Sequence, residues 1–132
     1  MWQYLERKQE KINWWFKNGD YGKNYFGIKY MNSKTKKESL FYPDWIIQFS
    51  DGQIGVFDTK MGKTATESET IDKARVLQEK LQEFKEKNSK SYVGGIVMKE
   101  NGIWYYNDSF NYSKGQSVND SKDWKPFEDL FN

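Results

Sequence analysis

The chain of 132 residues contains neither cysteine nor histidine, and it has only two prolines. Without thiol and imidazole groups, zinc and iron–sulfur centres, cysteine nucleophiles and triads of the Ser-His-Asp type are excluded. No apolar run approaches the roughly 20 residues that span a bilayer, and the N-terminus lacks the apolar core of a signal peptide. We therefore expect a cytoplasmic protein that uses carboxylate, lysine, hydroxyl and aromatic groups.

The chain also has little excess of either charge. It contains 21 Lys and Arg residues and 19 Asp and Glu residues, which gives a net charge of +2. This balance does not by itself indicate nucleic-acid binding, so the distribution of lysines must decide. Lysine clusters usually lie on a solvated loop or helix face, and the alternative role is contact with phosphate groups. The candidates for phosphate contacts are Lys34, Lys36, Lys37, Lys63 and Lys73.

Aromatic residues are abundant, with 6 Trp, 9 Tyr and 9 Phe, and no repeat or linker divides the chain. A single domain over residues 1–132 is therefore expected. Residues 1–11 have helical spacing but no capping residue in front. We interpret this uncapped start as the sign of a fragment from a longer chain.

The periodicity of apolar residues predicts an α/β fold, a mixed β-sheet flanked by α-helices. Apolar residues at steps of three or four predict one long helix over 66–87. Asn101-Gly102 is typical of a hairpin turn, and a short helix is expected near Phe127. The predicted strands cover residues 13–17, 24–30, 41–49, 53–59, 92–98 and 103–106.

The turn between the strands that end at Phe49 and begin at Gln53 decides whether two aspartates meet. A two-residue loop at Asp51-Gly52 would place Asp44 and Asp58 on opposite faces of the sheet. A three-residue loop that includes Ser50, with Gly52 in the left-handed conformation, would place Asp44 directly across from Asp58. Their Cβ atoms would then lie about 5 Å apart.

In that second register the two carboxylates repel each other, so a cation between them is favoured. Oxygen ligands without His or Cys indicate Mg²⁺ or Mn²⁺. Lys60 shares the face of Asp58, where its ammonium could hold water or offset charge on a phosphoryl oxygen. A lone D-x-K triplet is common by chance, so the hypothesis depends on its combination with Pro43-Asp44 and the helix that follows.

Tyr42-Pro43-Asp44-Trp45-Ile46-Ile47 and Gly55-Val56-Phe57-Asp58-Thr59-Lys60 resemble the two motifs of the PD-(D/E)XK nuclease superfamily, the restriction-endonuclease-like fold. Trp14-Trp15-Phe16-Lys17-Asn18-Gly19 and Tyr25-Phe26-Gly27-Ile28-Lys29-Tyr30 are similar to the C-terminal nuclease region of type III restriction subunits and helicase-nuclease proteins. The resemblance covers roughly residues 10–90.

The resemblance implies Mg²⁺-dependent hydrolysis of DNA, with Asp44 and Asp58 as metal ligands, the Thr59 carbonyl as a further ligand and Lys60 as the residue that positions water. It also implies a helicase or translocase region in the parent chain and, in the restriction systems, a modification subunit as partner. No G-x-x-x-x-G-K-[ST] motif occurs, so ATP binding is not expected here.

One departure from the family pattern concerns a further acid from the first helix, which we expect at or before Met1. Glu6 and Glu10 are the nearest substitutes. On the long helix, Lys73 and Gln78 are further candidates for the site, as related nucleases place Lys or Gln there. Trp14, Trp15 and Trp45 could stack on bases, but aromatic residues on strands more often belong to the core.

The favoured hypothesis is therefore a Mg²⁺-dependent nuclease domain that acts on DNA. The alternative within the same fold is a module that binds DNA or a partner protein without cutting. A third possibility is a small β-rich interaction domain in which Asp44 and Asp58 never meet, and this one requires the two-residue loop.

Overall fold

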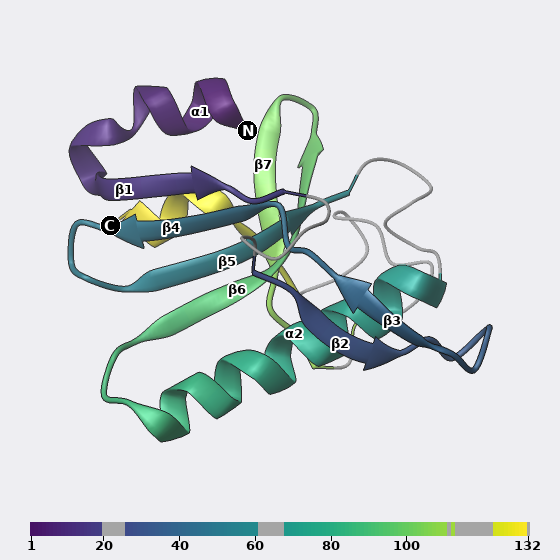
Figure 1. Cartoon of the computed structure of the whole chain (residues 1–132). Coiled ribbons are helices and arrows are strands. Elements are labelled where there is room, and N and C mark those ends of the chain that lie inside the picture. The colour runs from purple at the N-terminus through teal and green to yellow at the C-terminus, as the bar shows by residue number, and fades with distance from the viewer. Residues whose placement is uncertain (20–25, 61–67, 111, 113–122, 132) are drawn as a thin grey trace.

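The computed structural model describes residues 1–19, 26–60, 68–110, 112 and 123–131 (Figure 1). It confirms a mixed α/β architecture, with one large sheet, a separate two-stranded hairpin and helices on the large sheet. In chain order the elements are α1 (Trp2–Arg7), the 3₁₀ turn η1 (Gln9–Lys11), β1 (Ile12–Lys17), β2 (Ile28–Met31), β3 (Glu38–Phe41), β4 (Trp45–Phe49), β5 (Ile54–Thr59), α2 (Ser68–Lys87), β6 (Tyr92–Glu100), β7 (Ile103–Asn107), β8 (Trp124–Pro126) and the 3₁₀ helix η3 (Phe127–Phe131).

The large sheet has six strands in the order β1-β4-β5-β6-β7-β8. Every neighbouring pair is antiparallel except β5 and β6, which are parallel and joined through α2. A parallel pair needs such a crossover, since the chain must return to the same end of the sheet.

The described part of the chain has no helix with the length and apolar character needed to cross a bilayer.

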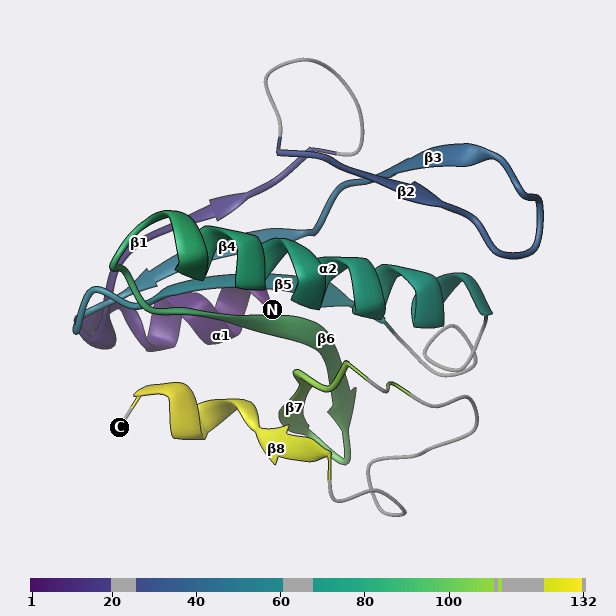
Figure 2. The same ribbon diagram turned by 90° about the horizontal axis from the view of Figure 1, so that it is seen from below.

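The two faces of the large sheet are covered by different elements (Figure 1). On one face Leu5 of α1 and Phe127 of η3 pack against Phe57 of β5. On the other face Leu77 and Leu81 of α2 pack against β5. The β2–β3 hairpin is not part of this sheet and lies alongside α2, as Figure 2 shows.

The strand expected over 41–49 is wrong as a single element, because β3 ends at Phe41 and β4 begins at Trp45. Pro43 lies in the interruption, where it has no N–H group to give to a strand ladder. The break sends β3 to the hairpin and β4 to the large sheet. It also leaves Asp44 free of the ladder, directly in front of β4.

Most other predicted elements are confirmed with shifts of one to four residues at their ends. The predicted first helix is shorter than expected, since α1 ends at Arg7 and a 3₁₀ turn follows. The described part of the long helix begins at Ser68, while positions 66 and 67 lie outside the described residues. Strand β8 was not predicted, because three residues are too short to show a period of two.

Candidate functional site

The turn of the β4–β5 hairpin sets the register that brings the two aspartates together. Phe49 donates its N–H to the Gln53 carbonyl at 2.9 Å, and Gly52 donates to the Phe49 carbonyl at 2.9 Å with a φ of +91°. Trp45 pairs with Phe57, so one further step places Asp44 opposite Asp58. The three-residue loop is therefore confirmed, and the β-rich domain with separated aspartates is wrong.

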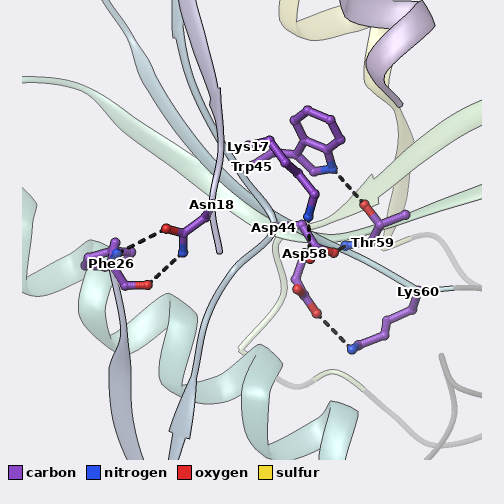
Figure 3. A network of polar contacts seen from close by, with 8 residues as sticks. All are labelled: Lys17, Asn18, Phe26, Asp44, Trp45, Asp58, Thr59 and Lys60. Carbon is purple, nitrogen blue, oxygen red and sulfur yellow. Dashed lines mark hydrogen bonds and ion pairs between the residues drawn. The ribbon is translucent and has the colours of Figure 1, made fainter. Parts of the chain in front are cut away.

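Asp44 is held between the ends of two neighbouring strands (Figure 3). Its Oδ2 accepts a hydrogen bond from the Thr59 N–H at 2.9 Å, and its Oδ1 lies 3.1 Å from the Lys17 ammonium. Its backbone carbonyl accepts from the Asn18 N–H at 2.7 Å. Asp44 is thus fixed by β5 on one side and by the end of β1 on the other.

Asp58 lies on the sheet face that α2 covers, and it is only 3% exposed. The Lys60 ammonium lies 3.0 Å from Oδ2 as an ion pair, and none of the described residues donates an aligned hydrogen bond to this oxygen. Burial, and after it repulsion from Asp44, raises the pKa of Asp58 to about 6, although Lys60 and Lys73 act in the opposite direction. The buried negative charge is therefore only partly compensated.

Thr59 links the site to the opposite face of the sheet. Its hydroxyl accepts a hydrogen bond from the Trp45 indole N–H at 3.2 Å, which fixes the side chain away from Asp58. The Lys60 N–H, not the Thr59 N–H, donates to Val97 of β6. Because the N–H and C=O groups of one strand residue point to the same side, the Thr59 carbonyl points toward Asp44. The main-chain oxygen expected as a ligand thus faces one of the two carboxylates.

The carboxylates open into a cleft of about 230 Å³ between β4, β5, α2 and the base of the β2–β3 hairpin. Lys73 of α2 joins the site here, with its ammonium 3.1 Å from Glu69 and 5.5 Å from the centre of the Phe41 ring. The side chains that line the cleft are Leu40, Phe41, Tyr42, Asp44, Asp58, Lys60 and Lys73. Asp44, Asp58, Lys60 and Lys73 therefore meet as expected from three separate segments of the sequence.

Other candidates do not reach the cleft. Lys34, Lys36 and Lys37 lie on the exposed turn between β2 and β3, and Lys63 lies outside the described residues. The hypothesis for Gln78 is wrong, because its side chain is buried and donates to the Gly94 carbonyl at 2.8 Å.

The first helical segment does not supply a further acid to the cleft within the described chain. Glu6 and Glu10 are exposed and do not line it, and Glu6 accepts a hydrogen bond from the Trp2 indole at 2.7 Å. Trp15 and Trp45 pack against each other and against Trp2, as the core interpretation expected, whereas that interpretation is wrong for Trp14, which is 45% exposed.

Two residues at the site were missed by the sequence analysis. Lys17 carries the ammonium on Asp44, and Asn18 is buried with its side-chain amide paired to both the N–H and the carbonyl of Phe26. Their position at the end of a strand would have placed them beside Asp44 only if the pairing of β1 with β4 had been known. That pairing joins segments about 30 residues apart.

The donor set fits a hard divalent cation, since it consists of carboxylate and carbonyl oxygens with one buried carboxylate oxygen that lacks a directed donor. Within the described ranges, no group of three or more His, Cys, Asp or Glu side chains could share a metal ion. The two aspartates and the Thr59 carbonyl are therefore the ligands available there.

Comparison of the chain with protein-family models, with curated proteins and with solved structures finds no match.

Proposed function

We propose that this domain hydrolyses phosphodiester bonds of DNA with the help of Mg²⁺ or Mn²⁺. The observation that carries the proposal is the pairing of Asp44 with the buried Asp58 at the open end of the β4–β5 hairpin, with Lys60 at 3.0 Å. Two like charges side by side, one of them buried, cost free energy in the free protein, so their presence at the rim of a cleft favours a cationic ligand. The motif resemblance to PD-(D/E)XK nucleases supports the same activity.

Asp44, Asp58 and the Thr59 carbonyl would hold the cation. When bound, it would polarise the phosphate and make a coordinated water more acidic. Lys60 would position the attacking water or offset charge that develops on a phosphoryl oxygen. Lys17 and Lys73 approach the same cleft from β1 and α2, where their ammonium groups would hold the substrate phosphate.

The resemblance also leads us to propose a place for this domain in a longer protein. A helicase or translocase region would bring DNA to the cleft, with a modification subunit as a further partner in a type III restriction system. The near-neutral net charge of +2 supports a model in which another region supplies most of the affinity for DNA, because this affinity follows the number of phosphates that are neutralised.

The test is cleavage of supercoiled plasmid with Mg²⁺ and with Mn²⁺, performed on the wild type and on Asp58→Asn. Asp129→Asn is the matched control, since it removes an exposed carboxylate of η3 far from the cleft. We expect metal-dependent nicking by the wild type and by the control, and none by Asp58→Asn. Equal nicking by all three proteins would show a contaminating nuclease and overturn the proposal.

A second candidate function is a module of the same fold that binds DNA or a partner protein without cutting. The observation that favours it is the pair of ammonium groups, one on each aspartate, which offset part of the negative charge without a metal. It predicts no cleavage and no rise of the melting temperature with Mg²⁺. The nuclease proposal predicts both effects, so the same samples separate the two.

A further inference from the structure

We infer that the turn and outer face of the β2–β3 hairpin form a surface for double-helical DNA. This inference rests on the proposed function in taking nucleic acid as the substrate, and it adds the form of that substrate. The surface consists of Lys29, Met31, Glu38 and Leu40 on the outer face and the turn from Asn32 to Lys37. Four lines of observation lead to it.

The first is a buried carboxylate that fixes the position of the turn. Asp72 of α2 is 2% exposed, and its Oδ2 accepts hydrogen bonds from the Ser33 N–H at 2.9 Å and the Ser33 hydroxyl at 2.8 Å. Burial of a carboxylate is unfavourable unless such bonds compensate it. The Asn32 side chain adds bonds from the N–H groups of Lys34 and Thr35. The turn is therefore held in one place relative to α2.

The second is the charge of this surface. Among the described residues, Lys29, Lys34, Lys36 and Lys37 have no carboxylate at ion-pair distance, whereas most lysines near the cleft are paired. Glu38 is the single acid of this surface, so the surface carries a net charge of +3. Exposed cations without intramolecular partners are available to replace the counterions of phosphate groups.

The third is the pattern of the two hairpin faces. Ile28, Tyr30 and Phe41 point inward and pack against α2, so the aromatic residues of the hairpin are buried. The outer face instead exposes Met31 (56%) and Leu40 (53%). Binding of single strands depends on aromatic platforms for base stacking, which this face does not present. A two-stranded ribbon with basic and aliphatic side chains is suited to the backbone and major groove of a duplex.

The fourth is continuity with the cleft. Leu40 lines the cleft beside Asp44, and Lys37 lies three residues before it on the way to the turn. At roughly 3.3 Å per residue this separation is about 10 Å, or about three base pairs of a duplex. One duplex can therefore touch the carboxylates and the turn at the same time.

The inference is tested by DNA binding without cleavage, in the Asp58→Asn background and without divalent metal. Fluorescence anisotropy over a series of salt concentrations compares a duplex with its isolated strands. The test variant is Lys34→Gln/Lys36→Asn/Lys37→Gln, with Asn at position 36 because φ there is 61° and Asn tolerates this region. The matched control, Lys11→Gln/Lys85→Gln/Lys90→Gln, removes three exposed charges that lie at the end of η1, near the end of α2 and between α2 and β6, none of them in the hairpin. Circular dichroism and thermal melts check that both variants fold.

We expect the turn variant to bind duplex at least about tenfold more weakly at about 0.1 M salt, with a salt slope shallower by about 3. The control should retain both the affinity and the slope of its parent, and the parent should prefer duplex to single strands. The inference is overturned if the two triple variants behave alike, if single strands lose affinity equally, or if the parent does not bind duplex. If the wild type cleaves DNA but the turn variant keeps its affinity for duplex, this inference alone is overturned. If the turn variant loses affinity for duplex but the wild type does not cleave, the proposed function alone is overturned.

Discussion

Asp58 and Asp72 are both buried, at 3% and 2% exposure, but their surroundings differ. Asp72 receives two hydrogen bonds from Ser33 on one oxygen and has Arg75 at 3.6 Å from the other. Asp58 faces Asp44 and has a single ammonium, without an aligned donor among the described residues. The protein therefore compensates one buried carboxylate with several donors and the other mainly with the Lys60 ammonium.

Under the proposed function, this difference separates a structural carboxylate, Asp72, from a functional one, Asp58. Asp72 fixes a turn, so its contribution should appear in stability. Asp58 is poorly compensated beside a cleft, which is typical of groups that act on a ligand at some cost in stability. The following predictions compare the two positions by the same Asp→Asn change wherever possible.

The largest difference is expected in metal-dependent cleavage. Asp58→Asn removes a charged ligand and should reduce the cleavage rate by about a thousandfold or more. Asp72→Asn leaves the side chains of the cleft unchanged. It should therefore reduce the cleavage rate by less than about tenfold. Plasmid nicking at saturating Mn²⁺ measures both, and equal losses at the two positions would remove the distinction.

Stability should respond with the opposite sign at the two positions. Asp72→Asn keeps an acceptor for Ser33 but loses charge assistance, so the free energy of unfolding should fall by about 1 to 2 kcal/mol. Asp58→Asn removes an incompletely compensated charge and should raise the free energy of unfolding at pH 7 by up to about 2 kcal/mol. Denaturant titration without metal measures both changes. A loss of stability in Asp58→Asn would contradict the interpretation of this site.

The pH dependence of stability should reveal Asp58 directly. Its pKa is raised from 3.8 to about 6 in the folded protein, so between these values the folded state binds more protons at this carboxyl than the unfolded state. The favourable contribution is therefore complete below about pH 4 and is lost as the pH rises through about 6. The decline should amount to about 2 to 3 kcal/mol.

Unfolding curves of the wild type and Asp58→Asn at several pH values give this contribution as their difference. Asp58→Asn should lack the decline between pH 4 and 6, while Asp72→Asn should retain it. Superimposable profiles for the wild type and Asp58→Asn would show that the charge of Asp58 is fully compensated.

The smallest effect concerns Lys17, which pairs with Asp44 and would therefore compete with the proposed metal for this carboxylate. Its side chain is 41% exposed, compared with 17% for Lys60, so its ion pair contributes little to stability. Lys17→Met should strengthen Mn²⁺ binding by up to about fivefold, the equivalent of about 1 kcal/mol. Lys8→Met is the control, because Lys8 pairs with Glu128 away from the cleft. Isothermal titration calorimetry measures the affinity, and weaker binding in Lys17→Met would exclude the competition.

Local features of the sequence predicted much of the fold. The long helix follows from one apolar stripe, and the hairpin at Asn101-Gly102 follows from two residues that adopt positive φ angles of 52° and 79°. For β4 and β5 the sequence left two registers open, and the structure has the one that the left-handed Gly52 was expected to accompany. In each case a few adjacent residues carry the physical cause, so no distant contact is needed.

The features that failed depend on segments far apart in the chain. Lys17 reaches Asp44 across 27 residues, and Ser33 reaches Asp72 across 39. Gln78 does face the sheet, but it meets Gly94 of β6 and not the cleft, because helical spacing gives a face of α2 but not the neighbour that each turn meets. The break between β3 and β4 did have a local signal, because Pro43 lacks an N–H group for the strand ladder. The pattern of apolar residues over 41–49 nevertheless led to the prediction of one continuous strand.

The sequence by itself determined the available chemistry, which is oxygen ligands and ammonium groups without thiol or imidazole, and it narrowed the turn between Asp44 and Asp58 to two loop lengths. Only the tertiary structure decided how deeply Asp58 is buried, which lysines reach the two carboxylates and where the basic turn is anchored. Turn geometry is a property of neighbouring residues, whereas burial and ion pairing arise when distant segments pack together.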